Sequence, residues 1–235
     1  MNKQKSCRTR YFSNAELFIL CASWAFIIVS FLIFDRHEYL TLAASLIGVT
    51  SLLLNAKGNP LGQLLTVIFS IIYGVISFSF AYYGEMITYL GMTAPMAVFA
   101  LITWLRHPYH GKRSEVTVNS IRKKEALILC FLTAAVTTLF YFILAALGTT
   151  NIVPSTISVT TSFLAVYLTA RRSKFFTLAY AANDIVLVVL WSLASLADRS
   201  YISVVICFLM FLVNDIYGFV NWSRMKRRQA CAENI

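Results

Sequence analysis

Residues 201–222 read YISVVICFLMFLVNDIYGFVNW, an apolar stretch of the length that crosses a lipid bilayer as one helix. A crossing takes about 20 apolar residues, because each helical residue adds about 1.5 Å along the axis. The segment must be helical there, since only a helix satisfies its own backbone hydrogen bonds in lipid. The polar pair Asn214-Asp215 interrupts the stretch where lipid penalises polar side chains. The sequence therefore predicts a transmembrane helix whose polar pair requires a specific environment.

Seven further apolar stretches of similar length precede this one along the chain. They cover residues 14–34, 39–55, 62–81, 86–105, 126–147, 152–169 and 175–196. Hydrophobic residues make up 59% of the 235 residues and charged residues only 13%, whereas soluble domains have about 25% charged residues. This composition excludes a soluble enzyme domain, a disordered tail and a disulfide scaffold. It predicts an all-α polytopic membrane protein with eight transmembrane helices.

The net charge of +10 reports on the orientation of these helices. If the N-terminus is cytoplasmic, 18 of the 20 basic residues lie on the cytoplasmic side, and only Arg36 and Arg199 lie on the other. Lysine and arginine are enriched in the cytoplasmic loops of membrane proteins. We therefore predict that both termini are cytoplasmic. The basic clusters are expected to meet anionic lipid headgroups and to bind no nucleic acid.

The chain also matches itself at an offset of 114 residues, which grows to 118. Asn55-Ala56-Lys57 corresponds to Thr169-Ala170-Arg171, and Thr103-Trp104-Leu105-Arg106 corresponds to Asn221-Trp222-Ser223-Arg224. The copies start four helices apart, so they are parallel, as in the three-helix repeats of SWEET transporters. We predict an extra N-terminal helix followed by a SWEET-like 3+1+3 parallel repeat. The predicted segments are the N-terminus with the extra helix (1–38), the first triple-helix bundle (39–106), the basic cytoplasmic loop and linker helix (107–150), the second triple-helix bundle (151–223) and the basic cytoplasmic tail (224–235).

Polar side chains inside the predicted helices mark a candidate substrate site. A carboxylate near the bilayer centre costs at least about 2.5–3.5 kcal/mol, and no basic residue inside a predicted helix can pair with Asp184 or Asp215. These carboxyls therefore line a watery cavity, carry a proton or await a cationic or hydroxyl-rich ligand, unless hydroxyls and amides between helices satisfy them. Trp104 and Trp222 end their helices, where an interfacial belt is an alternative role. The candidate binding residues are Gln63, Ser70, Tyr73, Asn183, Asp184, Trp191, Asn214, Asp215, Tyr217 and Asn221.

The run Asn214-Asp215-Ile216-Tyr217-Gly218-Phe219-Val220-Asn221-Trp222, with Ser70-Ile71-Ile72-Tyr73-Gly74 and Ala182-Asn183-Asp184, resembles the PnuC family of bacterial vitamin transporters. The resemblance covers roughly residues 39–228. It implies facilitated diffusion of nicotinamide riboside across the bacterial inner membrane, followed by cytoplasmic phosphorylation that traps the substrate. It also implies that Asn183, Asn214 and Asn221 lie in the binding region.

Other functions remain open at the level of sequence. Phe69 and Ala97 stand where many family members carry amide side chains, so thiamine, riboflavin or a deoxynucleoside are alternative substrates, and proton coupling through Asp184 or Asp215 is an alternative mechanism. A membrane-embedded enzyme is disfavoured, because the sequence has neither a phosphate-binding loop nor a nucleophile elbow nor metal-ligand spacing. We therefore predict no cofactor and no metal. The oligomeric state is open, with a trimer of identical chains as the candidate.

Overall fold

The computed structural model describes residues 11–79, 83–149 and 151–233. Within these ranges, eight helical segments are long and apolar enough to cross a membrane. They are α1 (Asn14–Phe34), α2 (Tyr39–Ala56), α3 (Pro60–Ser79), the combined segment of α4 (Tyr83–Ile87), the π-helix η1 (Thr88–Thr93) and α5 (Ala94–Arg106), α6 (Lys123–Ala146), α7 (Ile152–Ala170), α8 (Phe176–Ser195) and α9 (Ile202–Glu233). The prediction of an all-α polytopic fold with eight long helices is confirmed.

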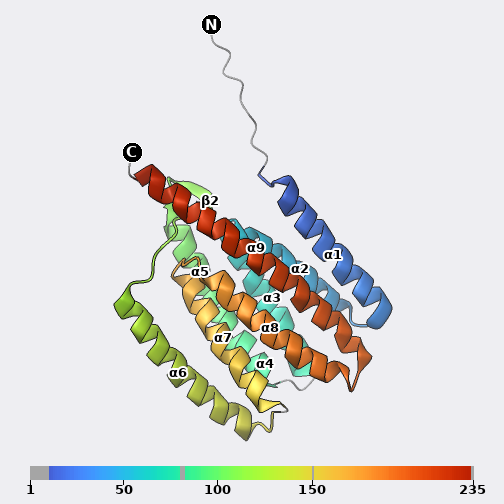
Figure 1. Ribbon diagram of the computed structural model, residues 1–235. Coiled ribbons are helices and arrows are strands. Elements are labelled where there is room, and N and C mark those ends of the chain that lie inside the picture. Colours follow the sequence, from blue (N-terminus) through green and yellow to red (C-terminus); the bar gives the residue numbers. More distant parts are fainter. Residues whose placement is uncertain (1–10, 80–82, 150, 234–235) are drawn as a thin grey trace.

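The helices form two three-helix bundles, called the triple helices below, with one further helix on either side (Figure 1). Helices α2, α3 and α5 pack in sequence order, and so do α7, α8 and α9. Contacts of α2 with α9 and of α5 with α7 join the two triple helices. Helix α1 packs on α2 and α9, while α6 lies against α7 at the opposite edge. The described helices therefore follow the predicted order of one extra helix, three, one and three.

Two buried tryptophans make the same contact between the triple helices. The indole Nε1 of Trp104 in α5 donates to the carbonyl oxygen of Thr169 in α7 at 2.9 Å, and that of Trp222 in α9 donates to Asn55 in α2 at 2.8 Å. The two donors, Trp104 and Trp222, occupy equivalent positions in the sequence repeat, and so do the two acceptors, Asn55 and Thr169. Both tryptophans have 0% exposure, so an interfacial-belt role is wrong for them. Instead they hold each triple helix to the other.

The turns that follow α2 and α7 repeat the same geometry. Gly58 and Arg172 have positive φ angles of 67° and 55° at equivalent positions of the two copies. Their carbonyl oxygens accept hydrogen bonds from the backbone N–H groups of Val116 and Asn119 at 3.0 and 2.9 Å. The linker between α5 and α6 is therefore fastened to both turns.

The linker and the end of α9 are more ordered than the sequence indicated. The linker contains an antiparallel hairpin of β1 (Pro108–Tyr109) and β2 (Lys112–Val116), and a short 3₁₀ turn, η2 (Arg199–Tyr201), precedes α9. Helix α9 continues past the predicted bilayer crossing to Glu233. The Gln229 amide explains this extension, because it donates to the carbonyl of Val116 at 3.1 Å and accepts from the N–H of Val118 at 2.8 Å.

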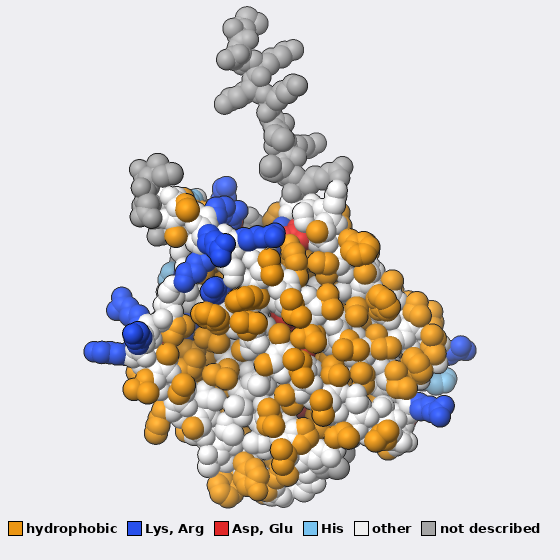
Figure 2. Space-filling model, in the orientation of Figure 1, with side chains coloured by type: hydrophobic (Ala, Val, Ile, Leu, Met, Phe, Trp, Pro, Cys, Tyr) orange, Lys and Arg blue, Asp and Glu red, His pale blue; other side chains and the backbone are white. Residues whose placement is uncertain are grey.

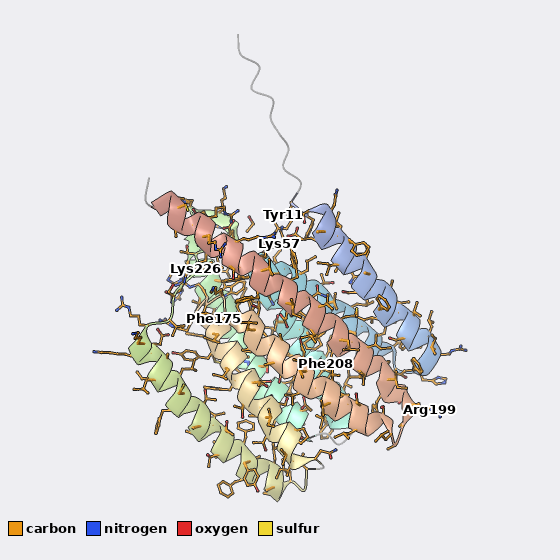
Figure 3. All side chains as sticks on the ribbon, in the orientation of Figure 1. Tyr11, Lys57, Phe175, Arg199, Phe208 and Lys226 are labelled. Carbon is orange, nitrogen blue, oxygen red and sulfur yellow. The ribbon has the colours of Figure 1, made fainter. Side chains whose placement is uncertain are left out.

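Basic side chains gather at one end of the molecule, and apolar side chains cover the middle (Figure 2). Lys57 lies at this basic end, while Arg199 lies at the opposite end (Figure 3). Arg106 ends α5, Arg171 follows the end of α7, and Arg224 lies in the second half of α9, so the chain order places them at the same end as Lys57. Among the basic residues used to predict orientation, those of the N-terminal segment lie outside the described residues: Lys3, Lys5, Arg8 and Arg10. The distribution follows the segregation of charge expected from the sequence.

Helices α2 and α3 approach each other closely at Gly62. A Cβ added there would lie 2.3 Å from Oδ1 and 2.6 Å from the backbone nitrogen of Asn55. Small residues permit such approaches between membrane helices, and forcing extra atoms into a packed site costs about 1–3 kcal/mol.

We expect the Gly62→Ala variant to unfold at a lower temperature than the unaltered protein in detergent, as measured by circular dichroism. Gly91→Ala is the matched control, because a Cβ at Gly91 meets only the side chain of Ile87 at 3.8 Å. Equal melting temperatures for the two variants would contradict the close packing of α2 on α3.

Candidate functional site

A narrow cavity lies between the two triple helices. Its volume is about 50 Å³, and since one water molecule needs about 10–15 Å³, it has room for only a few waters. The polar lining consists of Ser51, Asn55, Thr66, Thr93, Ser162, Asn183, Asp184 and Asp215. The aromatic lining consists of Phe69, Tyr89, Tyr180, Phe208 and Phe211. The cavity thus combines acidic, amide and aromatic groups contributed by both copies of the repeat.

Two carboxyl groups meet in this cavity. Asp184 is the ninth residue of α8, and Asp215 lies midway along α9; each is 3% exposed. Both carboxyls line the same cavity, and Oδ2 of Asp184 has no hydrogen-bond partner among the described residues. No lysine, arginine or histidine from the described part of the chain lines the cavity. The pair therefore requires a proton or a cationic ligand to balance its charge.

Asn183 is held in place by hydroxyl groups of α7. Its Oδ1 accepts hydrogen bonds from Ser158 at 3.2 Å, Thr161 at 2.8 Å and Ser162 at 3.1 Å. Within the described residues, its amide nitrogen has no hydrogen-bond partner. The oxygen is therefore saturated, while the N–H groups are available to a molecule in the cavity.

Gln63 and Ser70 lie behind the lining rather than in it. Nε2 of Gln63 donates to Oδ1 of Asn55 at 2.8 Å, and Nδ2 of Asn55 donates to the hydroxyl of Thr66 at 3.1 Å. The Ser70 hydroxyl donates to the carbonyl of Thr66 at 2.7 Å and is 0% exposed. Asn55 and Thr66 both line the cavity, so Gln63 and Ser70 act on it through these two residues.

Tyr73 and Trp191 belong to the apolar cluster next to the cavity. The ring of Tyr73 stacks on Phe69 at 5.5 Å and meets Tyr89 at 4.6 Å, measured between ring centroids. Tyr73 and Trp191 are 5% and 3% exposed and do not contribute to the lining. Tyr73 therefore supports the aromatic wall from behind.

Three candidate residues of α9 point away from the cavity. Nδ2 of Asn214 donates to the hydroxyl of Ser23 in α1 at 3.0 Å. The phenol of Tyr217 donates to Oε1 of Glu16 at 2.9 Å, and Nδ2 of Asn221 donates to the carbonyl of Ala56 at 2.8 Å. These residues connect α9 to α1 and α2, so only Asp215 of the polar residues on this run faces the cavity.

Several residues of the cavity were missed by the sequence analysis. Tyr89 and Phe208 line the cavity, but aromatic residues are frequent in transmembrane stretches, so nothing in the sequence distinguished these two. Asn55 was noticed only as part of the repeat. Glu85 is a third buried carboxyl, 6% exposed and near Tyr89, and it was missed because the predicted helix began after it. A boundary drawn one residue earlier would have included Glu85.

Two related triple helices that enclose a polar cavity in the middle of a membrane-crossing bundle are the architecture of a membrane transporter. The sequence model described as "Nicotinamide mononucleotide transporter" matches residues 38–224. The chain belongs to this family, and its resemblance to PnuC-type transporters is confirmed.

Named relatives are similar over most of their length. A nicotinamide riboside transporter PnuC of Neisseria mucosa is 22% identical over 202 residues, covering 84% of this chain and 77% of the relative. A protein of the same name from Haemophilus influenzae is 21% identical over 213 residues, covering 90% and 88%. The crystal structure of the vitamin B3 transporter PnuC superposes with a TM-score of 0.81 at 21% identity, covering 93% of this chain and 94% of that chain. The folds are therefore alike from end to end.

Proposed function

We propose that this protein carries nicotinamide riboside across the bacterial plasma membrane by facilitated diffusion. The observation that supports this most is the pair of Asp184 and Asp215, which line the cavity without a basic residue among the described lining. Nicotinamide riboside carries a positively charged pyridinium ring and ribose hydroxyls, so it supplies both the charge and the donors that the pair lacks. The names of two relatives agree with this substrate.

The charge of the cavity also favours the riboside over the phosphorylated mononucleotide. A phosphate group brings up to two negative charges to a site that already holds two carboxyls. Like charges in a medium of low dielectric repel strongly. The riboside lacks this phosphate and keeps the favourable cation.

Each group of the cavity has a role in the proposed complex. Asp184 and Asp215 balance the pyridinium charge, and the free N–H groups of Asn183 donate to ribose or carboxamide oxygens. The rings of Phe69 and Phe211 offer flat surfaces to the planar base, and a cation over an aromatic face gains about 0.5–2 kcal/mol. The ring centroids of these phenylalanines lie 5.7 Å apart.

Binding requires the cavity to widen, because about 50 Å³ is too small for a nucleoside. We propose that the bundles 39–106 and 151–223 rock against each other, which exposes the cavity to one side of the membrane at a time. The basic end is proposed to face the cytoplasm, where phosphorylation traps the substrate. The trimer of identical chains stays a prediction.

Uptake of labelled nicotinamide riboside into liposomes that contain the purified protein tests the proposal. We expect saturable uptake of the labelled substrate, and excess unlabelled nicotinamide riboside should abolish it. Excess nicotinamide mononucleotide should leave the uptake unchanged, because the carboxyls of the cavity repel its phosphate. Thiamine and riboflavin serve as the competing vitamins. Uptake of either one in place of nicotinamide riboside would overturn the proposed substrate, while uptake no greater than in protein-free liposomes would overturn unaided transport.

Proton coupling is a second candidate mechanism, favoured by the two buried carboxyls that line the same cavity. Two buried carboxyls that share a site do not readily ionise together, so one of them holds a proton in the absence of a cation. If this proton moves with the substrate, an imposed pH gradient will drive accumulation above the external concentration. Facilitated diffusion predicts that the internal concentration levels off at the external one with or without the gradient.

A further inference from the structure

A second and more open pocket lies at the basic end, between the start of α1, strand β2 and the last turns of α9. Tyr11 and Lys57 mark its position between α1 and α9 (Figure 3). Its volume is about 590 Å³, within the range of about 300–1,000 Å³ that is typical of small-molecule sites. It is separate from the central cavity, because the two share no lining residue among those described.

The lining of this pocket has an excess of positive charge. Its charged residues are Lys57, Lys112, Arg224 and Arg228, with the two carboxylates Glu16 and Glu115. Four cations against two anions leave a net charge of +2. This is the opposite sign to the central cavity, so the two pockets suit different ligands.

Two of the four cations are already neutralised by the two carboxylates. Nζ of Lys57 donates to both carboxylate oxygens of Glu16 at 2.9 Å, and Arg228 pairs with Glu115. Lys112 and Arg224 have no ion-pair partner among the described residues. Both side chains are exposed and border one concave space, so the uncompensated charge belongs to these two residues.

Neutral groups complete the pocket. The hydroxyl-bearing Ser114 and the ring of Tyr11 are part of the lining. Burial raises the pKa of the Tyr11 phenol, so this phenol is neutral at physiological pH. The Tyr11 hydroxyl accepts a hydrogen bond from Nδ2 of Asn59 at 2.6 Å, and this bond fixes the ring at the edge of the pocket.

We propose that this pocket binds a phosphate monoester, with Lys112 and Arg224 as the residues that hold the phosphate oxygens. A phosphate monoester carries nearly two negative charges at pH 7, which matches the excess charge of the lining. Arginine and lysine are the side chains that proteins use most for this group. The inference does not depend on the proposed substrate of the central cavity.

The same chemistry can come from a soluble nucleotide or from the headgroup of a phosphatidate lipid. A ligand held by Arg224 of α9 and Lys112 of β2 would bridge the last helix and the hairpin. The volume of the pocket accommodates a nucleoside monophosphate, and its position at the basic end also places it within reach of lipid headgroups.

Binding of adenosine monophosphate to the full-length protein tests the proposal. The protein is placed in nanodiscs of phosphatidylcholine, and affinity is measured by isothermal titration calorimetry for adenosine monophosphate, inorganic phosphate and adenosine. We expect the two phosphates to bind and adenosine not to bind. The double variant Lys112→Gln/Arg224→Gln should lose affinity by about tenfold or more, since each charged hydrogen bond contributes about a factor of ten when well formed.

A matched variant shows that the effect belongs to the pocket. Arg113→Gln/Arg227→Gln removes one charge from β2 and one from α9, but neither residue lines the pocket, so its affinity should be unchanged. If both double variants lose phosphate affinity equally, binding depends on general charge attraction and not on this pocket, which would overturn the proposal. Absence of phosphate binding to the unaltered protein, for both soluble phosphates and phosphatidate, would overturn it as well.

Nanodiscs that contain phosphatidate distinguish the two sources. If the lipid headgroup is the ligand, phosphatidate will lower the apparent affinity for adenosine monophosphate and will be retained by the unaltered protein but not by Lys112→Gln/Arg224→Gln in native mass spectrometry. If the ligand is soluble, phosphatidate will leave the affinity unchanged. The variant Asp184→Asn separates this inference from the proposed function, because it should lose nicotinamide riboside binding and keep phosphate binding.

Discussion

Replacing Asp184 or Asp215 by asparagine is expected to lower nicotinamide riboside uptake into liposomes by about 100-fold. Removing one partner of a buried charged contact costs about 2–5 kcal/mol, and each 1.4 kcal/mol is a factor of ten. Asparagine has nearly the shape of aspartate, so the substitution removes the charge and leaves the cavity intact. The loss should therefore appear in transport rather than in folding.

Thermal unfolding provides the second measurement for these variants. A buried carboxyl pair without a cation is costly to the folded protein, so either asparagine variant should unfold at the same or a higher temperature. Asp198→Asn is the matched control, because Asp198 lies in the exposed turn before α9 and should leave both uptake and stability unchanged. Unchanged uptake in both cavity variants would remove the carboxyls from the mechanism.

Trp222→Ala is expected to destabilise the protein by about 3–5 kcal/mol, the usual cost of truncating a fully buried tryptophan. Trp222 is 0% exposed and packs against Trp104 at 5.5 Å and Phe176 at 4.9 Å between ring centroids. Its indole also donates one of the two equivalent hydrogen bonds between the triple helices, to the carbonyl oxygen of Asn55. Circular dichroism during thermal unfolding in detergent measures the loss.

Two further variants test why Trp222 matters. Trp222→Phe keeps most of the packing and loses the hydrogen bond to Asn55, so its cost should be about 1–2 kcal/mol. Trp104→Ala should cost as much as Trp222→Ala, because the repeat places it in the same contact. Trp24→Ala is the control, since Trp24 of α1 is 40% exposed. A similar loss in Trp24→Ala would refute a specific role for the buried pair.

The number and order of the helices were predictable because each helix is set by the apolar character of its own stretch of sequence. Eight apolar stretches and the segregation of basic residues required no knowledge of how the helices pack. The repeat was also predictable, and the equivalent contacts of Trp104 and Trp222 show its physical basis. Most predicted helix ends agree to within a few residues, except that α9 continues to Glu233, since the hairpin that holds its end is remote in sequence.

The lining of the cavity was only partly predictable. Helical periodicity placed Asp184 and Asp215 on faces rich in aromatic residues, and both line the cavity. Asn214 is adjacent to Asp215 but bonds to Ser23 of α1, and Tyr217 reaches Glu16. Successive residues of a helix point about 100° apart, so neighbouring polar residues such as Asn214 and Asp215 lie on different faces of α9. The sequence alone did not show which of these faces lines the cavity.

The sequence by itself thus determined the membrane-crossing helices, their repeat and the presence of unpaired carboxyls within them, because hydropathy, charge and spacing are local properties. Only the tertiary structure decided which polar residues share a cavity and which join helices. The physical reason is that α9 packs on α1 and α2 as well as α8, so a different neighbouring helix covers each face of α9. Asp215 faces the cavity beside Asp184 because α8 occupies that side, while α1 covers Asn214.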